Sequence, residues 1–380
     1  MKTLSLLLKP ASSRCNLRCR YCFYAEVADS RRVGNYGAMG LEVLETVVRK
    51  ALAETTELCV FGFQGGEPTL AGLDFYRALI GFEKKYNVNG AGIGHSLQTN
   101  GLLLDDAWAG FLRENGFLVG LSLDPGRGVH DDLRRDAAGG GTSRQVLAAA
   151  RLLSERGVEY NILSVLTRFT AAHPDRTYRF YRQNGFRHLQ LIPCLDSLEE
   201  RREPGDYSLD VGTYGGFLRR FFDLWHRDFA AGDYVSVRMF DNYVHMLAGH
   251  PPENCGMAGV CNAYPVVEAD GSVYPCDFYA VDGFRLGRVQ DESFSALLGG
   301  EPARRFSAPS LEPHPACRSC EYFLLCRGGC RRDREPALDG RLSLNRHCEA
   351  YRAFFRHALP RLRELAERLF PRAGKPPPGF

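Results

Sequence analysis

The sequence predicts an α/β fold: a partial, open barrel of six parallel strands alternating with helices, then a cysteine-rich segment and a closing helix. Three observations indicate this. Short apolar runs alternate with helical patterns over roughly the first 195 residues, which favours parallel strands joined by right-handed crossovers. Six such units are too few for a closed eight-fold barrel, which typically takes about 250 residues. Cysteines then gather between residues 251 and 348, and an amphipathic pattern covers 349–370.

The strands are predicted from short runs of leucine, β-branched and aromatic side chains bounded by Gly, Pro or Asn. The first ends at Lys9-Pro10, and the second ends at a Gly-Gly-Glu-Pro stretch that begins at Gly65. Because chemistry in such folds gathers at the carboxyl ends of the strands, the loops after the first, second and fourth strands should share one edge. We expect strands at residues 3–8, 58–63, 94–98, 117–123, 160–166 and 188–193.

The intervening helices are predicted from apolar residues at helical spacing. An Asp pair at 105–106 is a signal for a helix start, and the Gly-rich stretch from Asp136 to Thr142 predicts a mobile loop. We expect helices at about 41–54, 73–86, 105–115, 144–156 and 174–184. The chain thus divides into a barrel (1–200), a helical extension (201–250), a cysteine-rich domain (251–348), a C-terminal helix (349–370) and a disordered tail (371–380).

Composition excludes several classes of function. The 380 residues are 44% hydrophobic and 24% charged, as in ordinary globular proteins. The net charge is only +3, and its arginines are spread along the chain, so there is no case for nucleic-acid binding. No apolar stretch reaches membrane-spanning length, and the N-terminal Leu/Ser run is too short for a signal peptide. We therefore expect a cytoplasmic protein that contacts no membrane.

Thirteen cysteines in a cytoplasmic chain favour metal ligation over disulfides, because that compartment keeps thiols reduced. Cys59 and Cys194 stand in or beside apolar strand-like runs, where buried and inert thiols are the usual case. Three of the other eleven lie close to the N-terminus, which leaves eight, the number needed for two four-thiolate sites. The three groups are Cys15, Cys19 and Cys22; Cys255, Cys261 and Cys276; and Cys317, Cys320, Cys326, Cys330 and Cys348.

The first group has the spacing C-x3-C-x2-C within the loop after the first strand. Thiolates are preferred ligands of iron–sulfur clusters, and three of them leave one iron of a cubane for a ligand that is not protein. A zinc knuckle or a disulfide pair is the alternative. Zinc would normally want a fourth Cys or His close by, and none lies between Cys22 and Cys59.

This spacing, with an aromatic residue before the third cysteine, resembles the signature of the radical S-adenosylmethionine (SAM) enzymes. The resemblance implies a [4Fe–4S] cluster on Cys15, Cys19 and Cys22 whose free iron is chelated by SAM. The Gly-Gly-Glu-Pro stretch resembles the second motif of that family, which holds the methionine end of SAM. By the same likeness, the SAM-binding residues would be Tyr21, Gly65, Gly66, Glu67, Ser122, Arg134 and Leu195.

The C-terminal cysteines resemble the SPASM extension of radical SAM maturases, which binds two auxiliary [4Fe–4S] clusters. That makes three clusters in all. A double zinc ribbon is the alternative, but the C-x5-C and C-x3-C intervals argue against it. The resemblance implies that Cys255, Cys261, Cys276 and Cys330 hold one auxiliary cluster, and that Cys317, Cys320, Cys326 and Cys348 hold the other.

Asp277 directly follows Cys276 in the stretch Tyr-Pro-Cys-Asp-Phe-Tyr. Together with Gly65-Gly66-Glu67-Pro68-Thr69-Leu70 and Arg327-Gly328-Gly329-Cys330-Arg331-Arg332, this stretch resembles the anaerobic sulfatase-maturating enzymes, over nearly the whole chain. The resemblance implies that a 5′-deoxyadenosyl radical takes a hydrogen atom from Cβ of a Cys or Ser, while Asp277 takes the proton as general base. The product would be Cα-formylglycine. We expect Tyr24 and Gln64 to lie at the same edge and contact the substrate.

The implied partners are an unfolded sulfatase segment with a Cys/Ser-x-Pro-x-Arg motif and an electron donor such as flavodoxin or ferredoxin. One departure stands out: the family's Asp-Gly-Pro after the fourth strand is Asp124-Pro125-Gly126 here, so that turn should differ. Two other functions share some of the motifs. One is a SPASM maturase that forms thioether or carbon–carbon crosslinks in a ribosomal peptide, and the other is a zinc-stabilised binding module.

Overall fold

Parallel strands form the centre of the first of two units into which the chain divides. The structure is a computed structural model that describes residues 1–198, 205–338 and 340–371. The first unit contains Met1–Ser164, Asp196–Glu203 and Asn262–Ala308, and the second contains Val165–Leu195, Pro204–Cys261 and Pro309–Phe380. Most of the predicted tail at 371–380 lies outside the described residues. Among the described residues, no helix combines the length and the apolar character needed to cross a lipid bilayer.

The sheet of the first unit has the strand order β12-β11-β10-β1-β3-β4-β5-β7. Every neighbouring pair from β1 to β7 is parallel, so the prediction from strand–helix alternation is confirmed. Along β1, Leu4, Leu6 and Leu8 are buried and alternate with more exposed residues, which is the two-residue period of a strand. The parallel strands are β1 (Thr3–Leu8), β3 (Leu58–Phe63), β4 (Gly92–Thr99), β5 (Phe117–Ser122) and β7 (Tyr160–Leu166).

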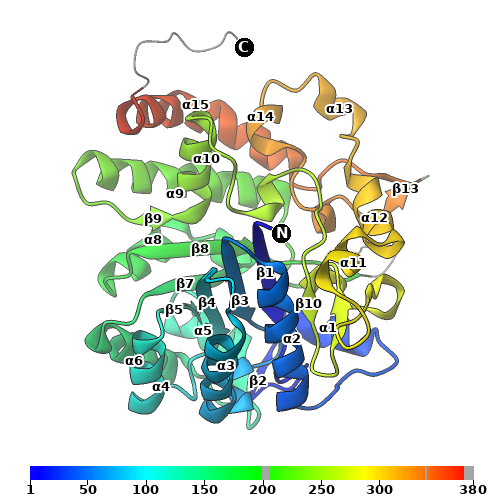
Figure 1. The fold of residues 1–380 in the computed structure, drawn as a ribbon. Helices are drawn as coiled ribbons and strands as arrows, with labels where there is room; N and C mark the ends of the chain where they lie inside the picture. The colour runs from blue at the N-terminus through cyan, green and yellow to red at the C-terminus, as the bar shows by residue number, and fades with distance from the viewer. Residues whose placement is uncertain (199–204, 339, 372–380) are drawn as a thin grey trace. The chain divides into compact units, whose positions relative to one another are not determined.

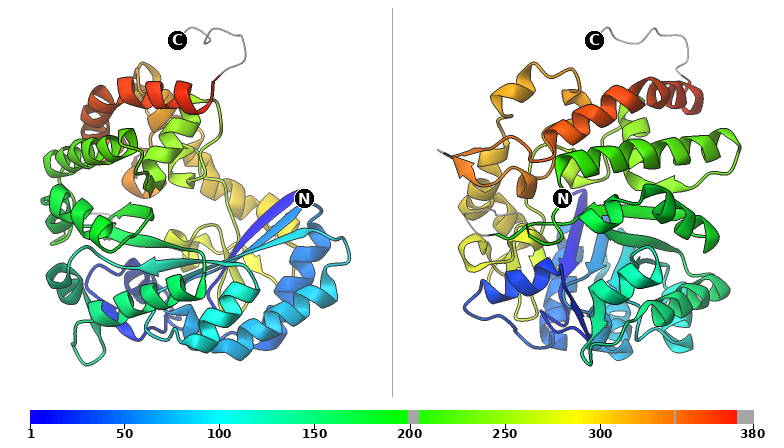
Figure 2. Two further views of the ribbon diagram at one scale, coloured as in Figure 1. Left: turned by 90° about the vertical axis from the view of Figure 1, so that its left-hand side faces the viewer. Right: turned by 180° about the vertical axis from the view of Figure 1, so that it is seen from behind.

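Helices cover one side of these strands (Figures 1 and 2). Their apolar residues recur every three or four positions, as Leu44, Val47 and Val48 do in α2, and this places them on one buried stripe. The Asp105 carboxylate caps α4 by accepting from the Trp108 N–H, as the Asp pair predicts. The helices are α2 (Leu41–Glu54), η1 (Pro68–Ala71), α3 (Leu73–Tyr86), α4 (Asp106–Glu114), α5 (Arg127–Leu133) and α6 (Ser143–Arg156).

Part of the cysteine-rich segment extends this sheet, which the sequence did not reveal. Strand β10 (Val266–Val267) pairs in parallel with β1, and β11 (Ser272–Tyr274) and β12 (Gly287–Arg288) continue in antiparallel fashion. Val266 and Tyr274 pack with Val27 of α1 (Phe23–Asp29) and with Ala280 in a buried cluster. This packing brings η3 (Asp277–Tyr279) against α1. The unit is completed by η4 (Asp282–Phe284), α11 (Phe294–Gly299) and α12 (Glu301–Ser307).

A second small sheet lies in the cluster loop. Strand β2 (Leu17–Cys19) pairs antiparallel with β6 (Arg134–Asp136), and Cys19 is directly opposite Arg134. The Gly-rich stretch that follows β6 is a tight turn, in which the Asp136 carboxylate accepts from the N–H groups of Ala138 and Gly140. The pair therefore places a predicted SAM residue beside a predicted cluster ligand.

The second unit has an aromatic core between long helices. Helix α9 packs against both α8 and α15, and α10 packs against α15, as Figure 1 shows. Phe222 and Phe240 contact Phe354 of α15, which confirms the predicted amphipathic C-terminal helix. The unit contains β8 (His188–Pro193), β9 (Ser236–Val237), β13 (Ala337–Leu338), β14 (Arg341–Leu342), α7 (Arg168–Ala171), α8 (Pro174–Gln183), α9 (Val211–Ala230), α10 (Arg238–Leu247), η2 (Cys255–Met257), α13 (Pro315–Arg318), α14 (Phe323–Cys326), η6 (Arg331–Asp333) and α15 (Cys348–Leu369).

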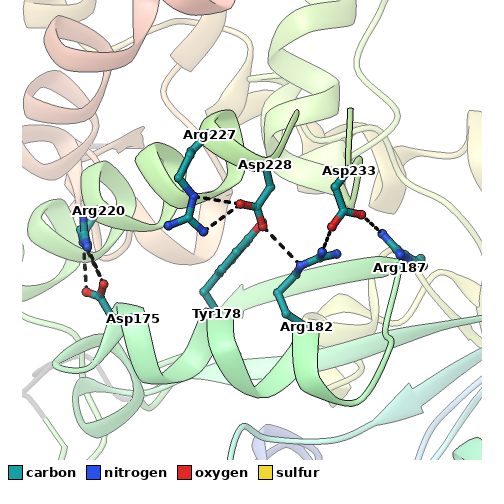
Figure 3. A network of polar contacts seen from close by, with 8 residues as sticks. All are labelled: Asp175, Tyr178, Arg182, Arg187, Arg220, Arg227, Asp228 and Asp233. Atoms are coloured by element: carbon teal, nitrogen blue, oxygen red, sulfur yellow. Dashed lines mark hydrogen bonds and ion pairs between the residues drawn. The ribbon is translucent and has the colours of Figure 1, made fainter. Parts of the chain in front are cut away.

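Ion pairs join α8 to α9 and to the loop before β9 (Figure 3). Arg220 donates to Asp175, and Tyr178 donates to Asp228 across the two helices. Asp233 accepts from two arginines, Arg182 and Arg187. Since most of these side chains are partly exposed, each pair is worth no more than about 1 kcal/mol.

Candidate active site and cluster ligands

The three N-terminal cysteines lie in the segment that follows β1, at the carboxyl edge of the sheet. Cys19 ends β2, and Cys22 is the N-cap of α1, so regular structure fixes two of the three. The Leu17 N–H lies 3.4 Å from the sulfur of Cys15 and donates to it, and the Cys22 N–H donates to the carbonyl of Cys19 at 3.2 Å. The spacing C-x3-C-x2-C thus becomes one folded loop that presents three sulfur atoms.

These thiols interact electrostatically. Burial raises the pKa of Cys15 to about 12 and that of Cys19 to about 11, and neighbouring thiolates add to both effects. Three thiolates can share this loop only if a positively charged centre displaces their protons. A donor set made only of thiolates suits iron–sulfur chemistry.

The structure adds two observations on cysteines and metals. All thirteen cysteines lie in its described part, and none of them forms a disulfide bond. Within the same ranges, no group of three or more His, Cys, Asp or Glu side chains is arranged as a site for a single metal ion.

The two glycines of the loop after β3 allow it to touch the cluster loop. Gly66 donates to the Ser12 carbonyl at 2.8 Å, and a Cβ added to Gly66 would lie 2.0 Å from the Arg14 carbonyl oxygen. Gly65 has a φ of 122°, which side chains other than glycine rarely adopt. Both glycines are therefore required by the close approach of the two loops, independently of any ligand.

Gly66→Ala is expected to move the loop that leads into Cys15, because the new methyl group cannot coexist with the Arg14 carbonyl. Overpacking of this kind typically costs about 1–3 kcal/mol. Iron per chain and the melting temperature, both measured without oxygen, should fall. Gly81→Ala in α3 is the matched control, since nothing lies within 4 Å of a Cβ added there. Unchanged iron and melting temperature in Gly66→Ala would contradict the packing argument.

The Glu67 carboxylate accepts hydrogen bonds from other residues of the protein. Its side chain is 1% exposed, and Oε1 accepts from the hydroxyls of Thr69 and Thr99 at 2.6 and 2.7 Å. Oε2 accepts from the Asn100 N–H at 2.8 Å. Glu67 thereby ties the end of β3 to the end of β4. The contact between Glu67 and SAM stays a prediction. In this structure the hydrogen bonds of Glu67 stabilise the loop that carries Gly65 and Gly66.

The other predicted SAM residues of the first unit gather around Asp124. The Asp124 carboxylate is fully buried and accepts from Arg134 Nε at 3.0 Å and from the Tyr21 hydroxyl. The Arg134 guanidinium also lies over the Tyr21 ring, 5.3 Å from its centroid. At the end of β5, the Ser122 hydroxyl accepts from the Gln98 amide at 2.9 Å.

The altered turn after β5 is compatible with this arrangement. Gly126 has a φ of 83°, and the Asp124 N–H donates to Nδ1 of the buried His130 at 3.2 Å. Burial lowers the pKa of His130 to about 4, so this ring is neutral at physiological pH. Nε2 of this neutral ring then donates to the Thr142 hydroxyl, which donates to the Arg134 carbonyl. One neutral histidine therefore orients both Asp124 and Arg134.

Asp277 is held on both of its carboxylate oxygens. The Tyr24 hydroxyl donates to Oδ2 at 3.2 Å, and the Tyr264 hydroxyl donates to Oδ1 at 2.9 Å. The Cys276 thiol lies 3.5 Å from Oδ1, and the Asp277 side chain is buried. Tyr24, predicted as a substrate contact, thus orients the predicted base. Tyr264 was missed, because no local pattern distinguishes it from a core tyrosine.

A buried group of charges lies next to Tyr24. Lys9 and Arg31 both donate to Oε1 of Glu268, and all three side chains are almost fully buried. The Lys9 ammonium is 5.3 Å from the centroid of the Tyr24 ring. Burial lowers the pKa of Lys9, whereas the Glu268 and Asp277 carboxylates oppose that shift, so the Lys9 ammonium and the Asp277 carboxylate attract each other through a medium of low dielectric.

Gln64 and Leu195 are predicted site residues that belong to none of the groups described above. The Gln64 N–H donates to the Leu8 carbonyl at 3.0 Å, which places the residue at the carboxyl edge of β3. Leu195 follows β8 in the second unit, so its predicted contact with the adenine stays a prediction. The contact of Gln64 with substrate is likewise a prediction.

The second unit brings the auxiliary cysteines together in two groups. Burial raises the pKa of Cys330 well above its usual value, and the thiolates of Cys261 and Cys255 raise it further. A Cβ added to Gly256 would lie 3.7 Å from the Cys330 Cβ, so the segments that carry Cys255 and Cys330 are in contact. Cys276, the fourth predicted ligand of this set, belongs to the first unit.

The second group gathers all four of its predicted ligands. Burial raises the pKa of Cys326 to about 11, and the thiolates of Cys348, Cys317 and Cys320 act in the same direction. Cys326 ends α14, and Cys348 begins α15, so helix termini fix both positions. The thiols of this unit thus act on one another in two groups, and the division of the cysteines into two ligand sets stays a prediction.

Comparisons with known proteins identify the same two segments. Residues 10–181 match the radical SAM superfamily, and residues 259–321 match the iron–sulfur cluster-binding SPASM domain. A cysteine-type anaerobic sulfatase-maturating enzyme of Clostridium novyi is 44% identical over 369 residues, which cover 97% of this chain and 99% of the relative. A serine-type enzyme of Bacteroides thetaiotaomicron is 30% identical over 376 residues, which cover 94% and 90% respectively.

A solved structure is similar over its whole length. It is native anSMEcpe with bound AdoMet and the Cp18Cys peptide, and it matches this chain with a TM-score of 0.92. The two are 45% identical, and the match covers 97% of this chain and 99% of that one.

Proposed function

The chain belongs to the anaerobic sulfatase-maturating enzymes of the radical SAM superfamily, and from this premise we propose that it oxidises a cysteine of a sulfatase to Cα-formylglycine. As a radical SAM enzyme with a SPASM domain it uses [4Fe–4S] clusters and SAM. The preference for cysteine rests on the higher identity to the cysteine-type relative, 44% against 30% for the serine-type one. The solved structure that is 45% identical holds a Cys peptide.

The residues of the first unit have the following roles in this proposal. Cys15, Cys19 and Cys22 hold the cluster, while Gly65, Gly66, Ser122 and Arg134 form the SAM site with the Tyr21 backbone. Bound there, SAM supplies a 5′-deoxyadenosyl radical, which takes a hydrogen atom from Cβ of the substrate. Arg134 stays oriented for this through Asp124 and His130.

Asp277 takes the proton of the substrate thiol. The single observation that supports this role is its buried carboxylate, held on both oxygens by Tyr24 and Tyr264 next to the Cys276 thiol. A base fixed in one orientation needs no reorganisation when the proton moves. Cys276 would hold an auxiliary cluster, and that cluster would supply an acceptor for the remaining electron next to the group that accepts the proton. Loss of one hydrogen atom, one proton and one electron gives the thioaldehyde, which water converts to the aldehyde with release of hydrogen sulfide.

The substrate in this proposal is an unfolded sulfatase segment with the motif Cys-x-Pro-x-Arg. Because the Asp277 carboxylate is buried, an extended peptide can bring a cysteine to it more readily than a folded domain can. The electron donor is a low-potential protein such as flavodoxin or ferredoxin, because radical SAM chemistry begins from a reduced cluster.

Mass spectrometry after anaerobic turnover tests the proposal. The full-length enzyme, with its clusters, SAM and a low-potential reductant, is incubated with a Cys-x-Pro-x-Arg peptide and with its serine counterpart. We expect the cysteine peptide to exchange sulfur and two hydrogens for one oxygen, and to react faster than the serine peptide. A product that instead retains its sulfur in a thioether or a crosslink would replace this function with a peptide-crosslinking one. Zinc without iron in anaerobically purified protein would exclude both.

A further inference from the structure

One buried arginine of the second unit has no counter-charge. The Arg334 side chain follows η6 and is only 3% exposed. Its Nη2 donates to the Gly259 carbonyl at 3.0 Å, but its Nε has no hydrogen-bond partner, and no carboxylate pairs with it among the described residues. Its neighbour Arg331, by contrast, is ion-paired with Glu335 at 2.9 Å.

Arg334 lies between the two groups of auxiliary cysteines. Gly259 belongs to the loop that joins Cys255 to Cys261 in the first group. On the other side, Nη1 lies 3.3 Å from the position of a Cβ added to Gly328, which stands between Cys326 and Cys330 in the chain. The guanidinium thus contacts the loop between Cys255 and Cys261. It also lies next to the segment between Cys326 and Cys330, which joins the two groups.

A buried guanidinium without a partner is costly, and it cannot lose its proton. In a folded protein such a charge is normally paired, and removal of its partner is strongly destabilising. The segments that Arg334 contacts carry cysteines of both groups. Four thiolates outweigh the positive charge of a cubane, so each occupied site is anionic and becomes more so on reduction.

We propose that Arg334 is the shared counter-ion of the two auxiliary clusters and raises the reduction potentials of both. This rests on the ligand sets of the proposed function. A nearby cation stabilises the more negative, reduced form, and net charge is one of the factors that set such potentials. In the proposed reaction an electron leaves the substrate by way of these clusters. Arg334 makes them better electron acceptors, although it contacts neither SAM nor the substrate.

Redox titration of the full-length holoenzyme, followed by electron paramagnetic resonance, tests this. Arg334→Gln should shift the auxiliary potentials to more negative values and leave that of the SAM-binding cluster unchanged. Arg334→Lys keeps the charge and should shift them less. Arg318→Gln is the matched control, because Arg318 adjoins Cys317 in the chain but its side chain is 64% exposed and screened by water.

The iron content of each variant is measured before its potentials, because it separates a counter-ion role of Arg334 from a packing role. Auxiliary iron lost in Arg334→Gln but kept in Arg334→Lys would support a counter-ion, since only the charge is restored. Iron lost equally in both variants would overturn the proposal in favour of packing. Full iron with unchanged potentials in Arg334→Gln would also overturn it. Wild-type enzyme without auxiliary iron would instead contradict the ligand sets of the proposed function.

Discussion

Replacement of Cys15, Cys19 and Cys22 with alanine is expected to abolish the cleavage of SAM. These residues supply all the predicted protein ligands of the cluster that binds the cofactor, and the loop offers no other thiol. The rate of 5′-deoxyadenosine formation should fall to that of the reductant alone. The chain should keep roughly two thirds of its iron, because the predicted ligands of the other two clusters are elsewhere. Chromatography of the nucleoside product and iron analysis measure both effects.

Cys59→Ala is the matched control for this triple variant. Cys59 is a buried thiol of β3 in the same unit, and its loss should leave iron and SAM cleavage intact apart from a modest loss of stability. If the triple variant cleaved SAM at the wild-type rate, the cluster would have to be held elsewhere and the assignment of the loop would be wrong.

Asp277→Asn is expected to slow formylglycine formation by about 10²–10⁴-fold, the usual contribution of a general base. The amide is nearly isosteric but cannot accept the thiol proton. SAM cleavage should persist, since the cluster loop and the SAM site do not depend on Asp277. Parallel measurement of peptide product and 5′-deoxyadenosine gives the ratio of the two, which should fall.

Asp282→Asn provides the comparison for this variant. Asp282 is an exposed carboxylate in the same segment, and it accepts from the Arg32 N–H rather than from a tyrosine. Its replacement should leave both products unchanged. Normal amounts of formylglycine from Asp277→Asn would mean that another group removes the proton.

Tyr24 and Tyr264 illustrate what the sequence could not provide. Tyr24 could be placed near the site, because it follows the cluster motif by two residues. Tyr264 reaches Asp277 from the stretch before β10, which itself pairs with β1 through residues far apart in the chain. Short strands such as β10 leave little periodicity in the sequence, and their formation depends on the partner strand.

The same distinction applies to charge. Lys9, Arg31 and Glu268 are unremarkable in the sequence, yet residues up to 259 positions apart meet in one buried group. Arg334 is one of many arginines, and only the structure reveals that it is buried and that no carboxylate of the described residues pairs with it. Tertiary packing decides whether an ionisable side chain is solvated or buried, and the neighbouring residues in the sequence do not reveal that packing.

By itself, the sequence determined the features that depend on neighbours along the chain. The spacing of Cys15, Cys19 and Cys22 specified a three-thiolate loop, and apolar periodicity specified the parallel strands and their helices. The tertiary structure alone decided which groups meet from distant segments: the phenols on Asp277, the cations on Glu268 and the Arg334 guanidinium on the Gly259 carbonyl. The physical reason is that backbone periodicity and ligand spacing act over a few residues, whereas burial and charge pairing depend on the whole folded chain.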